Sequence, residues 1–297
     1  MTLLAGALAL ASCANQATSD REMDRFIDDL MSRMTVEEKI GQLNLSGGDV
    51  PGVLSGAQGI DDLIRMGYLT ATGWAGIDEL TRLQKIAVEE SRLGIPMLCG
   101  VDVIHGFYTV FPIPLALSCT WDPEFVEKTA RVAAEEASAN GISWTYSPMV
   151  DIARDARWGR IAEGSGEDPY LGSLFSAAMV RGYQGEDLSA ENTIMACVKH
   201  FALYGASEAG RDYNTVDMSR VRMYNQYLAP YKAAAEAGAG SFMSSFNVID
   251  GIPATCNKWL LTDLLRNEWK YDGFVVTDYG SINEAVVHGI GDQSVTS

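Results

Sequence analysis

Short apolar runs alternate with longer amphipathic stretches through most of this 297-residue chain, and this alternation restricts the fold to a small class. The apolar runs are rich in β-branched and aromatic residues, as buried strands are, whereas the stretches between them have helical periodicity. Strands are predicted at residues 68–73, 96–101, 142–148, 194–199, 241–246 and 273–277. Helices are predicted at residues 77–91, 123–140, 174–183, 220–237, 258–269 and 283–288. This order predicts an α/β fold with a parallel sheet.

Polar residues stand where successive apolar runs stop. Asp102 follows PMLCGV, the pair Lys199 and His200 follows IMACV, and Asp278 follows GFVVT. In a barrel of alternating strands and helices these positions converge on the carboxyl-terminal rim, where active sites are built. A random scatter of polar residues would not select the same end of successive strands, so we expect a site here.

The segment RDARWGRIAEGSGEDPYLG, residues 154–172, combines arginines, carboxylates and aromatic residues without any apolar periodicity. It is predicted to be a loop. Loops of this composition, held by a rigid scaffold, often carry ligand-binding groups. On composition alone, a surface ion-pair network explains it equally well.

Four motifs in this order resemble the N-terminal catalytic domain of family 3 glycoside hydrolases, closest to the periplasmic bacterial β-glucosidases and β-xylosidases. They are GVDVIHG, the segment 154–172, VKHFALYGASEAGRDYNTVDMS and GFVVTDYGSINEAVVHG, and the resemblance runs from Met34 to the last residue. It implies a (β/α)8-type TIM barrel. Because only six or seven strands can be found, we expect residues 21–297 to form a barrel domain that is incomplete at its C-terminal end, with the family's following α/β sandwich domain missing.

The resemblance also implies roles for individual residues. Retaining glycosidases use one carboxylate as nucleophile and a second carboxyl group, about 5 Å away, as acid/base. Asp278 matches the family's nucleophile, although the position also suits an Asp that caps the next helix. Substrate-binding positions are matched by Asp102, Arg157, Lys199 and His200, with Met243 on the pocket wall and Tyr279 against the aglycone.

Other polar residues receive less specific predictions. An ion-pair scaffold is predicted for Arg154, Asp155, Arg160, Glu163, Glu167 and Asp168. His105 and His288 are expected to make local hydrogen bonds. No acid/base carboxyl is identified by the motifs; Glu208 lies on the loop where one branch of the family has its acid/base, and it is a weak candidate.

The resemblance implies a retaining, exo-acting β-glycosidase, first of all a β-glucosidase, that releases non-reducing terminal sugars through a covalent glycosyl-Asp intermediate. The alternatives are a β-xylosidase of the same family and a sugar-binding lipoprotein without hydrolytic activity. A Schiff-base aldolase would use Lys199, but no Gly-rich phosphate site accompanies it. We expect a β-linked oligosaccharide or glycoside as substrate, no cofactor and no metal ion.

Charge and the N-terminus bear on location. The net charge of −17 argues against nucleic acid or an anionic membrane surface as a partner. MTLLAGALALASC is apolar but too short to span a bilayer, and its last four residues resemble a lipobox, which predicts lipidation of Cys13. Residues 1–20 are therefore interpreted as a lipoprotein-type signal and tether, and the protein as periplasmic and lipid-anchored. Because no Lys or Arg precedes the apolar run, a disordered apolar leader is the alternative.

Four further cysteines have no metal-binding or disulfide-rich spacing. Cys99, Cys119, Cys197 and Cys256 all lie in or beside apolar runs. Buried free thiols are the default expectation, although an exported protein could pair two of them.

Overall fold

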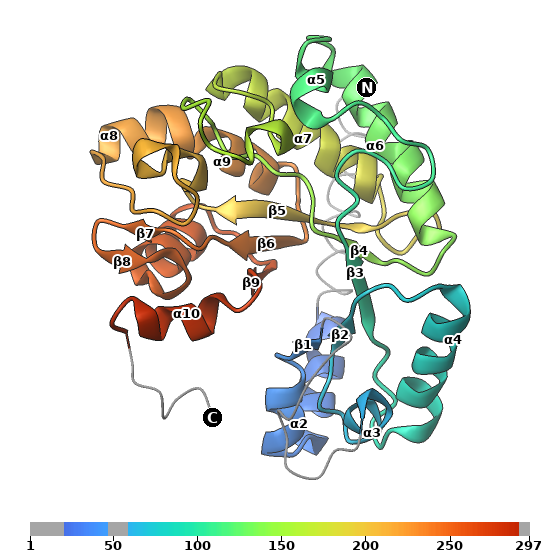
Figure 1. The fold of residues 1–297 in the computed structure, drawn as a ribbon. Coiled ribbons are helices and arrows are strands. Elements are labelled where there is room, and N and C mark those ends of the chain that lie inside the picture. Colours follow the sequence, from blue (N-terminus) through green and yellow to red (C-terminus); the bar gives the residue numbers. More distant parts are fainter. Residues whose placement is uncertain (1–20, 47–58, 291–297) are drawn as a thin grey trace, which may run out of the picture. The chain divides into compact units, whose positions relative to one another are not determined.

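The structure is a computed structural model that describes residues 21–46 and 59–290 (Figure 1). The chain divides into two compact units. One comprises the described residues up to Thr72 together with Asp78–Met97, and the other comprises Gly73–Ile77 and the described residues from Leu98 onward. The N-terminal signal predicted at residues 1–20, including Cys13, lies outside the described residues.

The smaller unit contains two short parallel strands and several helices. β1 (Leu45–Ser46) pairs with β2 (Ala71–Thr72), and the helices are α2 (Val36–Gly41), α3 (Ile60–Arg65), α4 (Ile77–Lys85) and the π-helical η1 (Ile86–Glu90). α2 begins with a capping box, in which the Thr35 hydroxyl accepts from the backbone N–H of Glu38 and the Glu38 carboxylate accepts from that of Thr35. These bonds satisfy two N–H groups that the helix itself leaves unpaired.

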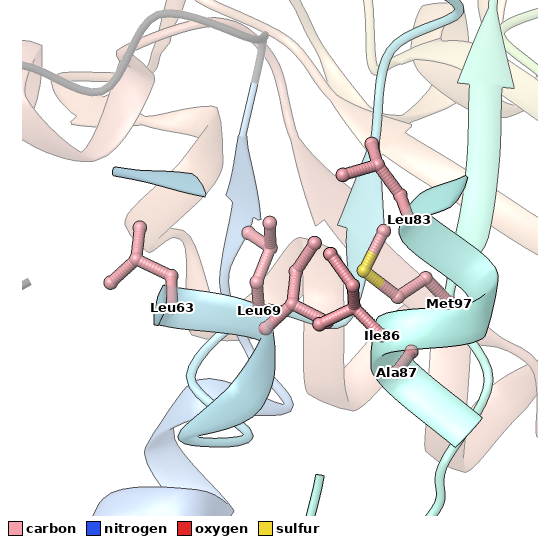
Figure 2. Close-up of a cluster of buried hydrophobic side chains, with 7 residues drawn as sticks. Leu63, Leu69, Leu83, Ile86, Ala87 and Met97 are labelled. Carbon is pink, nitrogen blue, oxygen red and sulfur yellow. The ribbon is translucent and has the colours of Figure 1, made fainter. Parts of the chain in front are cut away.

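The core of this unit lies between α3 and the continuous segment formed by α4 and η1. Leu83, Ile86 and Ala87 recur at helical spacing and are buried, so they form one apolar face. Figure 2 shows these side chains gathered with Leu69 and Met97. The amphipathic pattern predicted for residues 77–91 is therefore confirmed.

The larger unit contains a parallel sheet in the order β3-β4-β5-β6-β9. Its strands are β3 (Leu98–Val101), β4 (Trp144–Thr145), β5 (Met195–Phe201), β6 (Ser241–Ser244) and β9 (Phe274–Thr277). β5 and β6 are buried almost throughout, as expected for continuous apolar runs in a parallel sheet. A small hairpin of β7 (Val248–Ile249) and β8 (Ile252–Pro253) follows β6 (Figure 1).

Helical segments connect each of these strands to the next. α5 (Pro114–Ser118) and α6 (Pro123–Ser138) follow β3, and α7 (Pro169–Gln184) follows β4. α8 (Arg220–Arg222), the π-helical η5 (Met223–Tyr227) and α9 (Ala229–Glu236) follow β5, the π-helical η7 (Trp259–Glu268) follows β8, and α10 (Ser281–Val287) follows β9. This repeat confirms the predicted α/β class and the predicted barrel type of (β/α) fold.

The structure differs from the sequence-based prediction at α7. The segment 154–172 was predicted to be a loop throughout, but α7 begins within it at Pro169. The Asp168 carboxylate accepts a hydrogen bond from the backbone N–H of Leu171 at 2.7 Å, and Pro169 occupies the first helical position. Asp168 is therefore a helix cap, and its assignment to an ion-pair scaffold was wrong.

The four cysteines of the described residues test the expectation of buried free thiols. Cys99, Cys119, Cys197 and Cys256 are all free thiols, but only Cys99 and Cys197 are buried. The expectation of burial was wrong for Cys119 and Cys256, which lie at the exposed ends of short helical turns.

Within the described ranges, no helix is both long and apolar enough to cross a bilayer.

Candidate active site

The register of the sheet brings predicted site residues to one edge. Phe201 of β5 lies opposite Ser244 of β6, and Ser244 lies opposite Thr277 of β9. His200 and Asp278 are adjacent to these positions, so they meet at the carboxyl end of the strands. Met243 is buried in β6 beside them. The expectation that polar residues converge at this end of the sheet is confirmed for His200 and Asp278.

Lys199 and Asp102 form an ion pair. The Lys199 ammonium donates a hydrogen bond to Asp102 Oδ1, joining β5 to the residue that follows β3. The Lys199 side chain is 5% exposed and that of Asp102 is 55% exposed. The pair therefore presents a carboxylate to solvent while its cation is held inside the sheet edge.

His200 is buried between two carboxylates. Its Nδ1 lies 2.9 Å from Asp151 Oδ2 and its Nε2 lies 3.5 Å from Asp278 Oδ2. Burial lowers the pKa of His200, and the hydrogen bond to Asp151 opposes this effect only in part. The imidazole is therefore neutral near neutral pH.

Asp278 directly follows β9, and one of its oxygens is unpaired. Its Oδ1 accepts from the backbone N–H of Tyr279 at 2.7 Å, whereas Oδ2 is buried and accepts no hydrogen bond from any residue in the described ranges. An unpaired buried polar atom costs about 1–3 kcal/mol. Asp278 does not cap α10, whose N-cap is Gly280 without a side-chain hydrogen bond. The helix-cap alternative is therefore wrong.

The charged loop contributes ion pairs beside the site. Arg160 binds Glu163 at 2.6 Å, and although burial raises the pKa of Glu163, the hydrogen bond from Arg160 and the nearby positive charges of Arg160 and Lys199 together lower that pKa below its usual value. This confirms the predicted scaffold for these two residues. Arg157 binds Asp155 at 2.6 Å and lowers the pKa of Asp155 to about 2.

The structure does not bring Arg157 together with the other predicted residues. Its side chain is 70% exposed, and no contact among the described residues joins it to Asp102, Lys199 or Asp278. Tyr279 is 90% exposed, and Glu208 lies exposed in a short 3-10 turn (Glu208–Gly210). The roles given to Arg157 and Tyr279 stay predictions.

Aromatic rings pack beside the buried imidazole of His200. The ring of Tyr204 lies 5.2 Å from that of His200, and Trp158 of the charged loop lies 5.4 Å from Tyr204. The Trp158 indole N–H donates to Asp212 Oδ1 at 2.8 Å. His105 makes the predicted local contact, with Nδ1 3.0 Å from the carbonyl oxygen of Phe111. Across the described ranges, no group of three or more His, Cys, Asp or Glu side chains could hold a metal ion.

Sequence reasoning missed Asp151. It is buried, binds His200 and follows the apolar run SPMV, which is the same signal that identified Asp102 and Asp278. The signal was obscured because Asp151 adjoins a segment so rich in other charges.

Comparison with known proteins identifies the family. Residues 35–297 match the model described as the glycosyl hydrolase family 3 N terminal domain. The chain belongs to glycosyl hydrolase family 3. The match confirms the family that the four motifs predicted, and it covers the residues from position 35 onward.

Relatives in family 3 include named glycosidases. The chain is 43% identical over 286 residues to a periplasmic β-glucosidase of Salmonella typhimurium, covering 95% of this chain and 37% of that protein. It is 34% identical to a β-xylosidase of Formosa agariphila, covering 93% of this chain and 34% of that protein. The chain thus spans little more than a third of the length of these relatives.

Solved structures of β-glucosidases are similar to this chain. A β-glucosidase from Listeria innocua in complex with isofagomine has a TM-score of 0.82 and 44% identity, over 89% of this chain and 38% of that one. A mutant of that enzyme in complex with laminaribiose has a TM-score of 0.81 and 43% identity, over the same shares.

Proposed function

We propose that this family 3 chain carries the nucleophile half of a retaining, exo-acting β-glucosidase. The observation that carries the proposal is the buried Asp278 Oδ2, which has no hydrogen-bond donor among the described residues and lies at the sheet edge beside His200. In the reaction, Asp278 attacks the anomeric carbon, the bond to the leaving oxygen breaks, and water later hydrolyses the glycosyl ester.

Substrate recognition is proposed to rest on hydroxyl contacts. The half-exposed Asp102 carboxylate, held by Lys199, accepts hydrogen bonds from outer hydroxyls of the terminal sugar. Met243 forms part of the pocket wall, and Arg157 and Tyr279 would contribute after reorienting on substrate binding. The names of the relatives favour glucosides, and laminaribiose in a related structure is a β-linked glucoside.

The second carboxyl group is proposed to come from outside this sequence, in an α/β domain that follows the barrel. The relatives are nearly three times as long as the matched region, which leaves room for such a domain. Glu208 is exposed on a loop turn and lacks any contact with Asp278 in the described ranges, so it is the weaker candidate.

Two alternatives remain open to test. A β-xylosidase is favoured by the Formosa agariphila relative and would differ in the pocket around the sugar's C5 substituent. A binding protein without hydrolysis would form no covalent intermediate. A Schiff-base role for Lys199 is disfavoured because Asp102 engages its ammonium, whereas such lysines are activated by desolvation or a neighbouring cation.

We propose a periplasmic location with a lipid anchor at Cys13. The relative from Salmonella typhimurium is named as periplasmic, and the lipobox resemblance supports the finer claim. Growth with a labelled fatty acid should label the wild-type protein and leave Cys13→Ala unlabelled. Absence of label on the wild type would contradict the anchor alone.

Trapping the intermediate tests the reaction. A 2,4-dinitrophenyl 2-deoxy-2-fluoro-β-glucoside needs no proton donor for its leaving group, so it should add a fluoroglucosyl group to Asp278. Asp278→Asn should abolish the adduct, while the matched variant Asp272→Asn, an exposed carboxylate that precedes the same strand, should retain it. Peptide mapping that places the adduct on another carboxylate, or no adduct with either the glucoside or its xyloside analogue, would refute the proposal.

A further inference from the structure

Behind His200 lies a buried carboxylate that touches no solvent. Asp151 lies six residues after the end of β4, and its side chain is fully buried. Its Oδ2 accepts from the backbone N–H of His200 at 2.9 Å and lies 2.9 Å from Nδ1 of the same residue. Burying a carboxylate is costly unless it is hydrogen-bonded, so the arrangement requires each of these bonds.

Tyr231 of α9 completes the cluster. Its hydroxyl lies 2.5 Å from Asp151 Oδ1 and 2.7 Å from the carbonyl oxygen of His200, and both of these atoms are acceptors. Burial and the neighbouring Asp151 raise the pKa of Tyr231 well above its usual value, so the hydroxyl stays a donor. The hydroxyl has one proton, and the shorter contact directs it to Asp151 Oδ1, so Asp151 accepts hydrogen bonds on both of its oxygens.

This geometry fixes which nitrogen of His200 carries the proton. An ionised carboxylate only accepts, so Nδ1 must be the donor to Asp151, and in the neutral ring Nε2 is then an acceptor. Nε2 faces Asp278 Oδ2 at 3.5 Å, where two acceptors meet without a proton between them. The opposite tautomer would place an N–H there and bind the carboxylate oxygen.

We propose that Asp151 is a positioning residue that holds His200 as the Nδ1–H tautomer and so keeps Asp278 Oδ2 free of a hydrogen-bond donor. The inference rests on the proposed role of Asp278 as nucleophile. An oxygen that donates no electron density to a hydrogen bond attacks more readily, and the Nε2 lone pair is left to accept from a sugar hydroxyl.

Other charged groups around His200 do not alter the assignment. Lys199 precedes it in β5, Arg160 and Glu163 approach from the charged loop, and Tyr204 packs against the ring. Lys199 and Arg160 disfavour the imidazolium and therefore support a neutral ring. Asp151 is the one group among the described residues that contacts Nδ1.

The test combines a spectroscopic and a kinetic measurement. The chain contains three histidines, so ¹⁵N-histidine labelling gives few signals, and His105→Gln and His288→Gln assign them. We expect His200 in the wild type to be the Nδ1–H tautomer near neutral pH. Asp151→Asn removes the negative charge beside Nδ1 and leaves Asp278 beside Nε2, so the Nε2–H tautomer should appear and Asp278 labelling by the fluoroglucoside should slow by roughly 10²-fold or more.

A control variant distinguishes a change of the His200 tautomer from a general disturbance of the buried cluster. Tyr231→Phe removes a donor to Asp151 but leaves Asp151 and Nδ1 in place, so it should keep the Nδ1–H tautomer and slow labelling far less than Asp151→Asn. The loss in Asp151→Asn should fall in the rate constant of labelling rather than in the concentration that half-saturates it. A purely structural role would not separate these two quantities.

The outcomes distinguish this inference from the proposed function. A wild-type Nε2–H tautomer, or an Asp151→Asn variant that labels at the wild-type rate, would overturn the inference while leaving the nucleophile assignment intact. The wild-type tautomer can be read even if Asp151→Asn fails to fold. Failure of the wild type to label would refute the proposed function, with the tautomer still measured independently.

Discussion

Removing the charge of Asp102 should destabilise the protein more than removing that of its partner Lys199. The reason is the unequal burial of the pair, 5% exposed for Lys199 and 55% for Asp102. Asp102→Ala leaves a buried ammonium without a counter-ion, whereas Lys199→Met leaves a carboxylate that water can reach, and Met keeps most of the lysine's apolar stem.

The magnitude follows from this asymmetry. Breaking a fully buried pair costs about 3–5 kcal/mol and losing an exposed one about 0–1 kcal/mol. Because one partner is half exposed, we expect Asp102→Ala to lower the free energy of unfolding by about 2–3 kcal/mol and Lys199→Met by about 1 kcal/mol or less. The double variant should be more stable than Asp102→Ala alone, because no buried charge is left unpaired.

Urea unfolding monitored by fluorescence gives these values from the transition midpoint and slope. The exposed pair of Lys258 and Asp263 is the matched control, and Asp263→Ala should change the free energy of unfolding by about 0.5 kcal/mol at most. Equal losses in Asp102→Ala and Lys199→Met would refute the reasoning from burial. So would a double variant less stable than both single variants.

Three other measurements test the remaining conclusions. The 297-residue chain should release dinitrophenolate from an activated β-glucoside but little glucose from cellobiose, because a missing acid/base costs roughly 10²- to 10⁴-fold; equal rates would place the acid within this chain and make Glu208→Gln the next variant. The pKa of His200 is lowered in the folded state, so as the pH falls below about 6.5 the unfolded state takes up a proton before the folded state does, and the free energy of unfolding should decrease. In His200→Gln the urea midpoint should therefore depend less on pH over that range. An unchanged pH dependence would contradict the buried neutral ring. Among the four thiols of the described ranges, Cys119 and Cys256 should react with a disulfide reagent in the native state, whereas burial raises the pKa of Cys99 to about 11 and that of Cys197 to about 12 and should delay their reaction until unfolding.

The sequence predicted strands that read as uninterrupted apolar runs, whether buried almost throughout like β5 or only partly buried like β9. β5 was expected at residues 194–199 and is Met195–Phe201, and β9 was expected at 273–277 and is Phe274–Thr277. The short strand β1 and helices such as α2 and α3 were missed, since segments of two to six residues carry too little periodicity. α6 and α7 both begin with an Asp cap followed by Pro, and this signal at the start of α7 was overlooked within the charged segment.

The site was predicted in outline but not in its pairings. Lys199, His200 and Asp278 were located because polar residues that follow apolar runs are expected at the carboxyl ends of strands, and this criterion depends only on where the apolar runs stop. It could not decide which of several neighbouring carboxylates Arg157 or Arg160 would bind, since that depends on side-chain geometry of a few ångströms. Asp151 also follows an apolar run, and it was missed because the charged segment beside it obscured that signal.

The strand that carries Asp278 is held differently from its neighbours. β9 is only partly buried and, within the described residues, pairs with β6 alone, whereas β5 pairs on both sides and is buried almost throughout. Local opening costs least where few apolar contacts and few ladder hydrogen bonds must break. Lys199 and His200 therefore lie on a strand that neighbouring strands hold on both sides, whereas Asp278, the proposed nucleophile, follows a strand that pairs with β6 in the described residues. The separation of His200 and Asp278 thus depends on the β5–β6 and β6–β9 pairings, so a substitution that loosens either pairing should alter the site without touching either residue.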